Sequence, residues 1–174
     1  RAVCGRYNVP AHPVAQLVRA LAGTTLDGDR YNVAPTETVP VLRARDGDGP
    51  PCELTFMRWW LVPWWSDGPS QKYAMFNARS ETVLKSRAYR DPFRRRRCLL
   101  PASGFVEWQR TEQGKQPWQI RPAVDEGLLL AGVWDRWEGS GDVVESCSIL
   151  TTDAHPALSF LHPRMPVLLG RDEV

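Results

Sequence analysis

Short apolar runs bounded by glycine, proline and acidic residues dominate the chain, and this pattern is typical of β-strands joined by tight turns. One stretch has helical spacing instead. It begins at Pro13 and stops at Gly23, and its apolar residues fall on one face: Val14, Leu17, Val18 and Leu21. We therefore predict a short amphipathic helix between these two residues.

Three segments each contain two strand-like runs around a turn, and each predicts a β-hairpin. The first covers residues 38–62 and has an Asp/Gly/Pro turn. The second covers residues 98–122 and turns at Glu-Gln-Gly-Lys. The third covers residues 127–152 and turns at Glu-Gly-Ser-Gly-Asp, and a last strand is predicted over residues 165–169.

Two further segments favour helical structure. Residues 80–92 predict a short helix that Ser80 caps and Asp91-Pro92 ends, and residues 155–161 predict one helical turn. No repeat, low-complexity tract or linker divides the sequence. We therefore predict a single domain over residues 1–174 of the α+β class, in which mainly antiparallel hairpins curl into a barrel-like core with a few short helices.

Composition agrees with one soluble domain. A chain of 174 residues with 43% hydrophobic content can bury one sizeable core. The longest apolar run, near residues 128–133, is too short to span a bilayer, and no segment resembles a signal peptide, so we expect a cytoplasmic protein without membrane contact. The four cysteines lie far apart and there are only three histidines, so we expect reduced thiols and neither a zinc site nor a disulfide framework.

The kinds of charged and aromatic residue change the picture more than the net charge of +2. The 22 basic residues are 19 arginines and 3 lysines, and they accompany eight tryptophans. Arginine holds phosphate at two points and stacks on flat rings, and arginine interleaved with indole is typical of surfaces that bind single-stranded nucleic acid. The alternatives are nucleotide bias of the genome, which we favour for most of the arginines because their codons are GC-rich, and a tryptophan-rich core.

The tryptophans of the cluster WWLVPWW fit both interpretations, two of them the core and two of them a binding surface. Trp59 and Trp60 belong to the predicted strand. Trp64 and Trp65 follow Val62-Pro63 into a loop, where adjacent exposed indoles need a partner.

Four stretches carry candidate chemistry: Cys4-Gly5-Arg6, then FNARSET with Asn77 and Arg79, PASGFVEW with Glu107, and LHPRMP with His162 and Arg164. Each residue also has a plain structural interpretation. Cys4 can be a passive thiol, Asn77 can satisfy a turn, Arg79 can pair with Glu81, and His162 can bond backbone on both nitrogens. Glu107 is harder to dismiss, because it shares a strand face with Phe105, and burial there would raise its pKa and make it a proton donor near neutral pH.

Taken together and in order, the motifs CGR, RYNVAPT, RWWLVPWW, NARSET, RRCLLPASGFVEW and HPRMPVLL resemble the SRAP domain family. The resemblance runs from Cys4 to about Gly170. It implies the SRAP fold, and it implies covalent capture of abasic sites in single-stranded DNA without a metal or organic cofactor.

An N-terminal cysteine suits that chemistry. Its α-amine, which titrates near pH 8, condenses with the aldehyde of the opened sugar, and its own thiol then closes a five-membered thiazolidine. The second step is intramolecular and gains from proximity.

The resemblance also implies roles for the other motif residues. Asn77 would bond the cysteine terminus, Glu107 would protonate the ring oxygen as the sugar opens, and His162 would hold the sugar hydroxyl or shuttle protons. Four arginines would bind phosphates: Arg6, Arg79, Arg87 and Arg164. Four other residues would stack bases or stop a duplex end at a single-strand junction: Pro35, Trp64, Trp65 and Trp108.

Two features depart from the family pattern. Arg1, Ala2 and Val3 precede Cys4 and would block its amine, so we expect their removal, by trimming or by self-cleavage that Glu107 and His162 assist. The sequence stops at Val174, where relatives usually continue.

Two alternative functions stay open beside the capture of abasic sites by a monomer. One is a thiol-dependent peptidase in which Cys4, His162 and Asn77 are nucleophile, base and orienting group. The other is a non-catalytic single-stranded DNA-binding domain.

Overall fold

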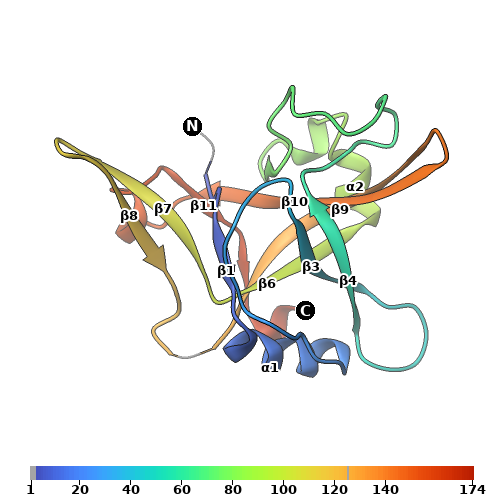
Figure 1. Ribbon diagram of the computed structural model, residues 1–174, viewed down its shortest axis with the longest axis horizontal. Coiled ribbons are helices and arrows are strands. Elements are labelled where there is room, and N and C mark those ends of the chain that lie inside the picture. Colours follow the sequence, from blue (N-terminus) through green and yellow to red (C-terminus); the bar gives the residue numbers. More distant parts are fainter. Residues whose placement is uncertain (1–2, 125) are drawn as a thin grey trace.

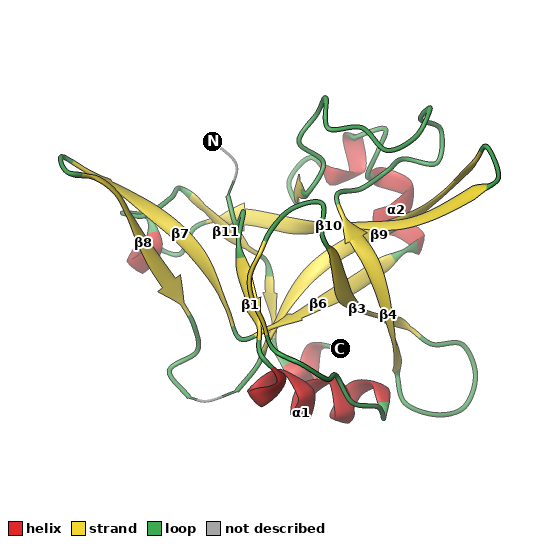
Figure 2. Cartoon of the chain, in the orientation of Figure 1, coloured by secondary structure: helices red, strands yellow, loops and turns green. Residues whose placement is uncertain are grey.

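The strands of the chain form two β-sheets (Figures 1 and 2). The computed structural model describes residues 3–124 and 126–174. The smaller sheet has the order β2-β1-β7-β8, and these strands are Arg30–Val33, Tyr7–Val9, Gly104–Thr111 and Gly114–Ile120 respectively. Strands β7 and β8 form a long hairpin at the left of Figure 1.

The larger sheet closes on itself. Its order is β11-β10-β4-β3-β6-β9-β12, and because β9 also pairs with β10, the five strands β10, β4, β3, β6 and β9 form a closed barrel. Strand β5 adds to β10 in parallel. The bounds of the strands are β3 Thr38–Ala44, β4 Cys52–Trp59, β5 Asn77–Arg79, β6 Arg97–Ala102, β9 Leu128–Gly139, β10 Asp142–Asp153, β11 Arg164–Pro166 and β12 Leu168–Leu169. The predicted α+β class with a barrel-like, mainly antiparallel core is confirmed.

The helical elements are short. Helix α1 spans Ala11–Ala22 and lies at one end of the barrel, at the bottom of Figure 1. Helix α2 spans Arg90–Arg95, and three single turns of 3₁₀ helix are η1 Val83–Lys85, η2 Pro156–Leu158 and η3 Arg171–Glu173. In the described ranges, no helix combines the length and the apolar character that crossing a membrane requires.

The first predicted helix is confirmed. His12 has non-helical backbone angles, so regular turns begin at Pro13, and the predicted apolar face is buried. Gly23 ends the helix in a left-handed conformation (φ 64°), and its N–H donates to the Arg19 carbonyl oxygen.

The helix predicted over residues 80–92 is wrong. Ser86 is extended (ψ 129°) and separates η1 from α2, and the Ser80 side chain caps neither element. Asp91-Pro92 lies in the first turn of α2 and does not end a helix. The physical reason is that proline has no N–H to donate, and the first turn of a helix needs none.

The predicted hairpins over residues 38–62 and 127–152 are confirmed, as is the helical turn near residue 156. Two predicted strands are interrupted. Residues 98–110 divide at Ser103 into β6 and β7, which belong to different sheets. Residues 165–169 divide at Val167, whose N–H donates to the Leu150 carbonyl of β10 and whose carbonyl accepts from the Ala131 N–H of β9. The chain therefore pairs with β10 before Val167 and with β9 after it.

Trp59 anchors the part of the core that lies beneath the candidate chemistry. Its ring meets Tyr7 edge to face, with the ring centroids 5.0 Å apart, and Phe76 at 5.9 Å. Its Nε1–H donates to the Phe76 carbonyl oxygen at 2.9 Å, and the residue is fully buried. Trp59 therefore fixes Phe76, the residue immediately before Asn77.

We expect Trp59→Phe to lower the free energy of unfolding by about 2 kcal/mol, because it removes buried volume and a hydrogen bond to a buried carbonyl. The matched change Trp64→Phe, at an indole that is 59% exposed, is expected to alter it by less than about 0.5 kcal/mol. Urea unfolding followed by circular dichroism measures both variants. Equal losses would contradict the assignment of Trp59 as the anchor.

Candidate functional site

Strand β1 carries Cys4 to the buried face of β7. Tyr7 pairs with Phe105, and the Val106 N–H donates to the Arg6 carbonyl at 2.9 Å, so the antiparallel pairing continues beyond the end of β1. At the next position the Cys4 backbone N–H donates to the Glu107 carboxylate. Both residues are buried, with 0% and 4% of their surface exposed.

Asn77 reaches the same point from β5. Ala78 pairs with Leu150, and the Tyr89 hydroxyl donates to the Asn77 carbonyl at 3.2 Å, so the backbone of β5 is held on both sides. The Asn77 Nδ2 donates to the carbonyl oxygen of Val3. Its Oδ1 is buried and has no hydrogen-bond partner among the described residues.

The peptide group between Val3 and Cys4 is thus bound at both ends, its carbonyl by Asn77 and its nitrogen by Glu107. Cys4 also has a φ of 49°, in the left-handed region. That conformation costs a residue with a side chain of order 1 kcal/mol, and such strain concentrates at functional sites.

The thiol of Cys4 is held in its neutral form. Burial raises the pKa of this thiol well above its ordinary value, and the nearby Glu107 carboxylate raises the pKa further. The sulfur therefore carries its proton at neutral pH and is a weaker nucleophile than a thiolate. It can still add to a carbon that is already activated.

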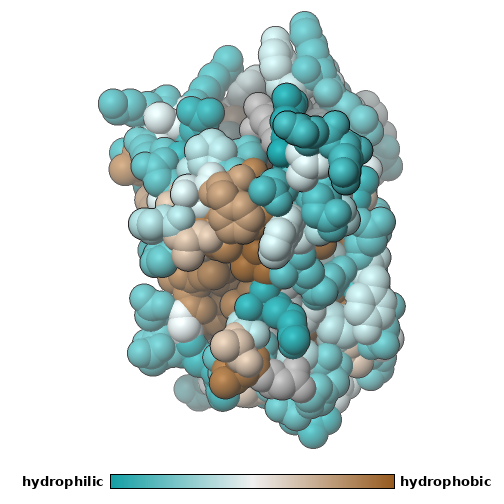
Figure 3. Space-filling view, turned by 90° about the vertical axis from the view of Figure 1, so that its left-hand side faces the viewer, coloured by the Kyte–Doolittle hydropathy of each residue, from teal (hydrophilic) through white to brown (hydrophobic). Residues whose placement is uncertain are grey.

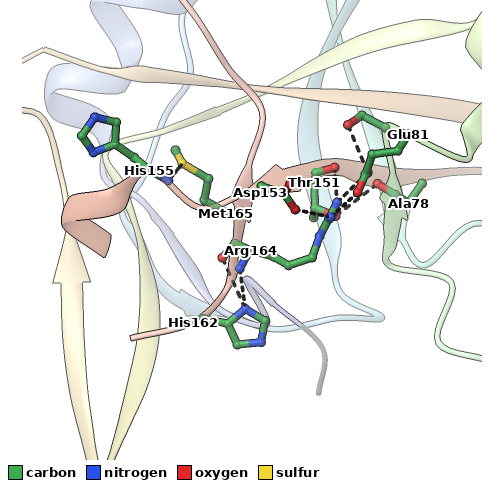
Figure 4. A network of polar contacts seen from close by, with 9 residues as sticks. Ala78, Glu81, Thr151, Asp153, His155, His162, Arg164 and Met165 are labelled. Atoms are coloured by element: carbon green, nitrogen blue, oxygen red, sulfur yellow. Dashed lines mark hydrogen bonds and ion pairs between the residues drawn. The ribbon is translucent and has the colours of Figure 1, made fainter. Parts of the chain in front are cut away.

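His162 is buried and lies two residues before Arg164, the first residue of β11. Its Nδ1 lies 3.1 Å from the Arg164 backbone nitrogen and 3.3 Å from the Arg164 carbonyl oxygen (Figure 4). This confirms one half of the structural interpretation of His162, a ring nitrogen bonded to backbone.

The Arg164 side chain lies in a network of oxygen acceptors. Its guanidinium donates to both carboxylate oxygens of Glu81, to Asp153, and to the backbone and side-chain oxygens of Thr151 (Figure 4). Only 12% of the side chain is exposed. Sequence reasoning offered Glu81 as a partner of Arg79, and the structure gives it to Arg164.

Strand β10 gathers these groups. It pairs in parallel with β5, where Thr151 is opposite Arg79, and antiparallel with β11, where Asp153 is opposite Arg164. Asn77, Arg79 and Arg164, far apart in the sequence, therefore meet at the last residues of one strand. No local pattern signals this placement, and for that reason the sequence analysis missed Thr151, Tyr89 and the pairing of Glu81 with Arg164.

A second group of predicted residues lies on the segment that follows β4. The Arg87 guanidinium covers the Trp65 ring at 4.1 Å from its centroid. The Trp64 N–H donates to the buried Asp135 carboxylate at 3.2 Å, which holds the loop against β9. Trp64 and Trp65 are both exposed, as predicted for adjacent indoles in a loop.

The remaining predicted residues border the first group or its sheet. Arg79 is exposed, and Arg6 is half-buried with its side chain donating to the Gly5 carbonyl at 2.7 Å. Trp108 is half-buried beside Glu107 on β7, and Pro35 is half-buried in the turn after β2. Figure 3 shows an apolar area surrounded by hydrophilic residues on the side of the molecule where the β7–β8 hairpin lies.

All four cysteines are free and buried. Within residues 3–124 and 126–174, no group of three or more His, Cys, Asp or Glu side chains could hold a metal ion. Arg1 and Ala2, on which the expected removal of the leading residues bears, lie outside the described residues.

Comparison with known proteins gives a consistent result. The family model of the SOS response associated peptidase (SRAP) matches residues 3–174. The chain is 34% identical over 144 residues to the abasic site processing protein YoaM of Bacillus subtilis, and 37% identical over 172 residues to the abasic site processing protein HMCES of Gallus gallus. Each match covers 82% of this chain, but only 62% of YoaM and 51% of HMCES.

Among solved structures, the fold resembles that of a Bacteroides thetaiotaomicron protein with a TM-score of 0.82. The two chains are 24% identical, and the match covers 98% of this chain and 78% of the other. At this identity the likeness shows the fold alone.

We expect Glu107→Gln to lower the pKa of the Cys4 thiol, because the negative charge that opposes the thiolate is removed. The pKa stays above its ordinary value, since burial is the larger cause. The ¹³Cβ chemical shift of Cys4, followed with rising pH, should begin to move at lower pH in this variant. Glu112→Gln, at an exposed turn of the same hairpin, is the control, and identical curves for both variants would show that Glu107 does not act on the thiol.

Proposed function

The chain belongs to the SOS response associated peptidase (SRAP) family, and on this premise we propose that it captures abasic sites in single-stranded DNA through a covalent bond to Cys4. The observation that carries the proposal is the arrangement around the Cys4 nitrogen. A buried carboxylate accepts from that nitrogen, and the half-buried amide of Asn77 donates to the adjoining carbonyl. Folding stability does not explain a carboxylate at this position, because burying one costs on the order of several kcal/mol unless it is well paired.

The bond we propose is a thiazolidine. The free α-amine of Cys4 adds to the C1′ aldehyde of the opened deoxyribose and loses water to give an imine. The S–H of the same residue then adds across the C=N bond, so that sulfur binds carbon and the proton goes to nitrogen. A neutral thiol is suited to this order of steps, because the imine carbon is activated before the sulfur attacks.

Glu107 and His162 supply the proton transfers. Glu107 accepts from the cysteine nitrogen, which places it to take a proton as the amine attacks and to return it to the leaving oxygen. His162, whose Nδ1 lies against the Arg164 backbone, would donate from Nε2 to a sugar oxygen during ring opening. The chemistry requires neither a metal nor an organic cofactor.

Asn77 holds the reagent in place. Its Nδ2 would pass from the Val3 carbonyl to the DNA or to water once the leading residues are gone, and its unpaired buried Oδ1 would accept from the free amine. The Nδ2 already lies on the peptide group that joins Val3 to Cys4.

The DNA backbone would follow arginines at the surface, of which Arg79 and Arg87 are exposed and Arg6 is half-buried. Arg6, Arg79 and Arg87 bind phosphates in this proposal, and the bases stack on Trp64, Trp65, Trp108 and Pro35, with a duplex end stopping against this aromatic group. The protein would act as a monomer on the DNA of the cytoplasm, at the nucleoid in a bacterial cell. Binding of this kind weakens as salt rises.

We further propose that the site exposes its own amine. Water adds to the Val3 carbonyl, Asn77 stabilises the oxyanion that forms, and Glu107 passes a proton from that water to the departing Cys4 nitrogen. The products are a carboxylate at Val3 and an amine at Cys4, so atoms balance. The binding of this peptide group at both ends, and the left-handed backbone of Cys4, support the proposal.

A form of the chain released with Cys4 as its first residue should give a heat-stable band with an abasic single-stranded oligonucleotide on a denaturing gel. The same oligonucleotide with an intact base should give none. Cys4→Ala should abolish the band, because alanine keeps the α-amine but has no thiol to close the ring, and the imine that the amine forms is reversible. A covalent band in Cys4→Ala would contradict the proposed bond.

The same experiment separates the alternatives. A shift on a native gel without a covalent band would indicate a non-catalytic single-strand binder. Cleavage of added peptides with no preference for DNA would indicate a thiol-dependent peptidase.

We expect the intact mass of the purified chain to show loss of the residues before Cys4. Asn77→Ala should slow this loss about a hundredfold, as removal of an oxyanion donor does elsewhere. Glu107→Gln should also slow it, and Glu112→Gln should not. An uncleaved mass in a sample that forms the heat-stable adduct would refute both the processing and the need for a free amine.

A further inference from the structure

We propose that Trp118 and Phe160 form an aromatic platform on which one base of single-stranded DNA, next to the abasic site, stacks. The inference deepens the proposed function and rests on it, because it names two further residues that would bind the same DNA. The sequence analysis assigned no role to either ring.

Trp118 lies beside the carboxylate to which proton transfer is assigned. In the antiparallel pairing of β7 and β8, Trp118 is directly opposite Glu107. Residues that are directly opposite in such a pair point to the same face of the sheet, with their Cβ atoms about 5 Å apart. The indole therefore extends from the hairpin face that carries Glu107, the residue bound to the Cys4 nitrogen.

Phe160 supplies the second ring from the segment that leads to His162. It lies between η2 and β11, two residues before His162. Its neighbour Leu161 is buried, whereas Phe160 is 54% exposed. The Phe160 ring meets the Trp118 ring edge to face, with the centroids 5.5 Å apart and the planes at 86°. The platform therefore joins the hairpin that carries Glu107 to the segment that carries His162.

The indole has a fixed orientation although 44% of Trp118 is exposed. Its Nε1–H donates to the Gln109 Oε1 at 3.1 Å, across the same hairpin, and the Phe160 ring supports it on one side. A ring whose plane is set before binding loses little conformational entropy when a ligand stacks on it. Ordered aromatic surface that stays in contact with water is typical of a binding site.

The charge of the hairpin selects the kind of partner. Between positions 109 and 121 it carries three exposed cations, Arg110, Lys115 and Arg121, and one exposed carboxylate, Glu112 in the turn. On the face that carries Trp118, the side chains nearer the turn are uncharged. A positive hairpin with an exposed indole suits a nucleic-acid strand, which offers both phosphates and flat bases, better than it suits an apolar protein surface.

The experiment is a double-mutant cycle between one side chain and one base. The ligand is a single-stranded oligonucleotide with a tetrahydrofuran analogue at the abasic position, which has no aldehyde and forms no bond. A second tetrahydrofuran residue then replaces the base on each flank in turn. The Kd of each oligonucleotide is measured for the parent chain, for Trp118→Ala and for Phe160→Ala.

With the parent chain, loss of the base on one flank should raise the Kd about tenfold, because a base stacked on an aromatic ring is lost. Trp118→Ala should raise the Kd of the oligonucleotide with both flanking bases by a similar factor. Loss of that base should then raise the Kd of Trp118→Ala by less than about twofold, since two changes that remove one contact are not additive. Phe160→Ala should show the same coupling with a smaller effect.

Phe56→Ala is the matched control. Phe56 is 54% exposed, as is Phe160, but it lies on β4, on the other side of the molecule from the β7–β8 hairpin in Figure 1. We expect its Kd for every oligonucleotide to stay within about twofold of the value for the parent chain.

Additive effects of Trp118→Ala and base loss on both flanks would overturn the inference, because they would show that the ring and the base do not touch. An unchanged Kd in Trp118→Ala would also overturn it and would leave the two rings to a protein partner.

The covalent band on a denaturing gel tests the proposed function separately, with an abasic oligonucleotide and the chain that begins at Cys4. Coupling without a band would retain the platform and reject covalent capture. A band without coupling would reject the platform and retain covalent capture.

Discussion

Strand β10 is the constraint on which the rest of the structure depends, because it pairs with four other strands along its length. Its pairing with β9 and β4 closes the barrel, and its last residues pair with β5 and β11. Two very short strands with few backbone bonds of their own are thereby held in register against a twelve-residue strand. Asn77 lies on one of these short strands and Arg164 on the other, so the candidate site inherits its geometry from the barrel and needs no rigid loop.

The buried polar groups around Cys4 show how this geometry is used. A carboxylate and an amide in a protein interior lower stability unless each has partners. Here the Glu107 carboxylate and the Asn77 Nδ2 both bind one peptide group, while the Asn77 Oδ1 has no partner among the described residues. The Trp59, Tyr7 and Phe76 rings exclude water beneath the site, and this exclusion keeps the thiol of Cys4 neutral. Stability in this region therefore comes largely from the aromatic rings, while the proposed chemistry is assigned to the polar groups.

The sequence predicted the parts of the fold that local chemistry determines. The face of α1, its end at Gly23, the hairpins and the burial of Trp59 all follow from period and turn residues. The prediction failed where contacts distant in the sequence determine the structure. Pro92 was predicted to end a helix, but it lies in the first turn of α2. Val167 was predicted to lie inside one strand, but its backbone binds both Leu150 and Ala131 and divides that strand. The candidate residues came from motifs, but the bond between Glu81 and Arg164 joins residues 83 positions apart, and no pattern along the chain encodes it.

The arginines divide in a way that net charge conceals. Arg43 and Arg164 each bind two carboxylates and add little positive potential at the surface. Arg79 is exposed and Arg87 is bound to a ring face, and neither has an ion-pair partner in the described part of the chain. Cations without a carboxylate attract phosphate most strongly, because a phosphate that approaches them displaces no bound anion. A chain with a net charge of only +2 can therefore offer a strongly positive path, provided that its acidic residues neutralise the arginines that hold the fold and leave the others free.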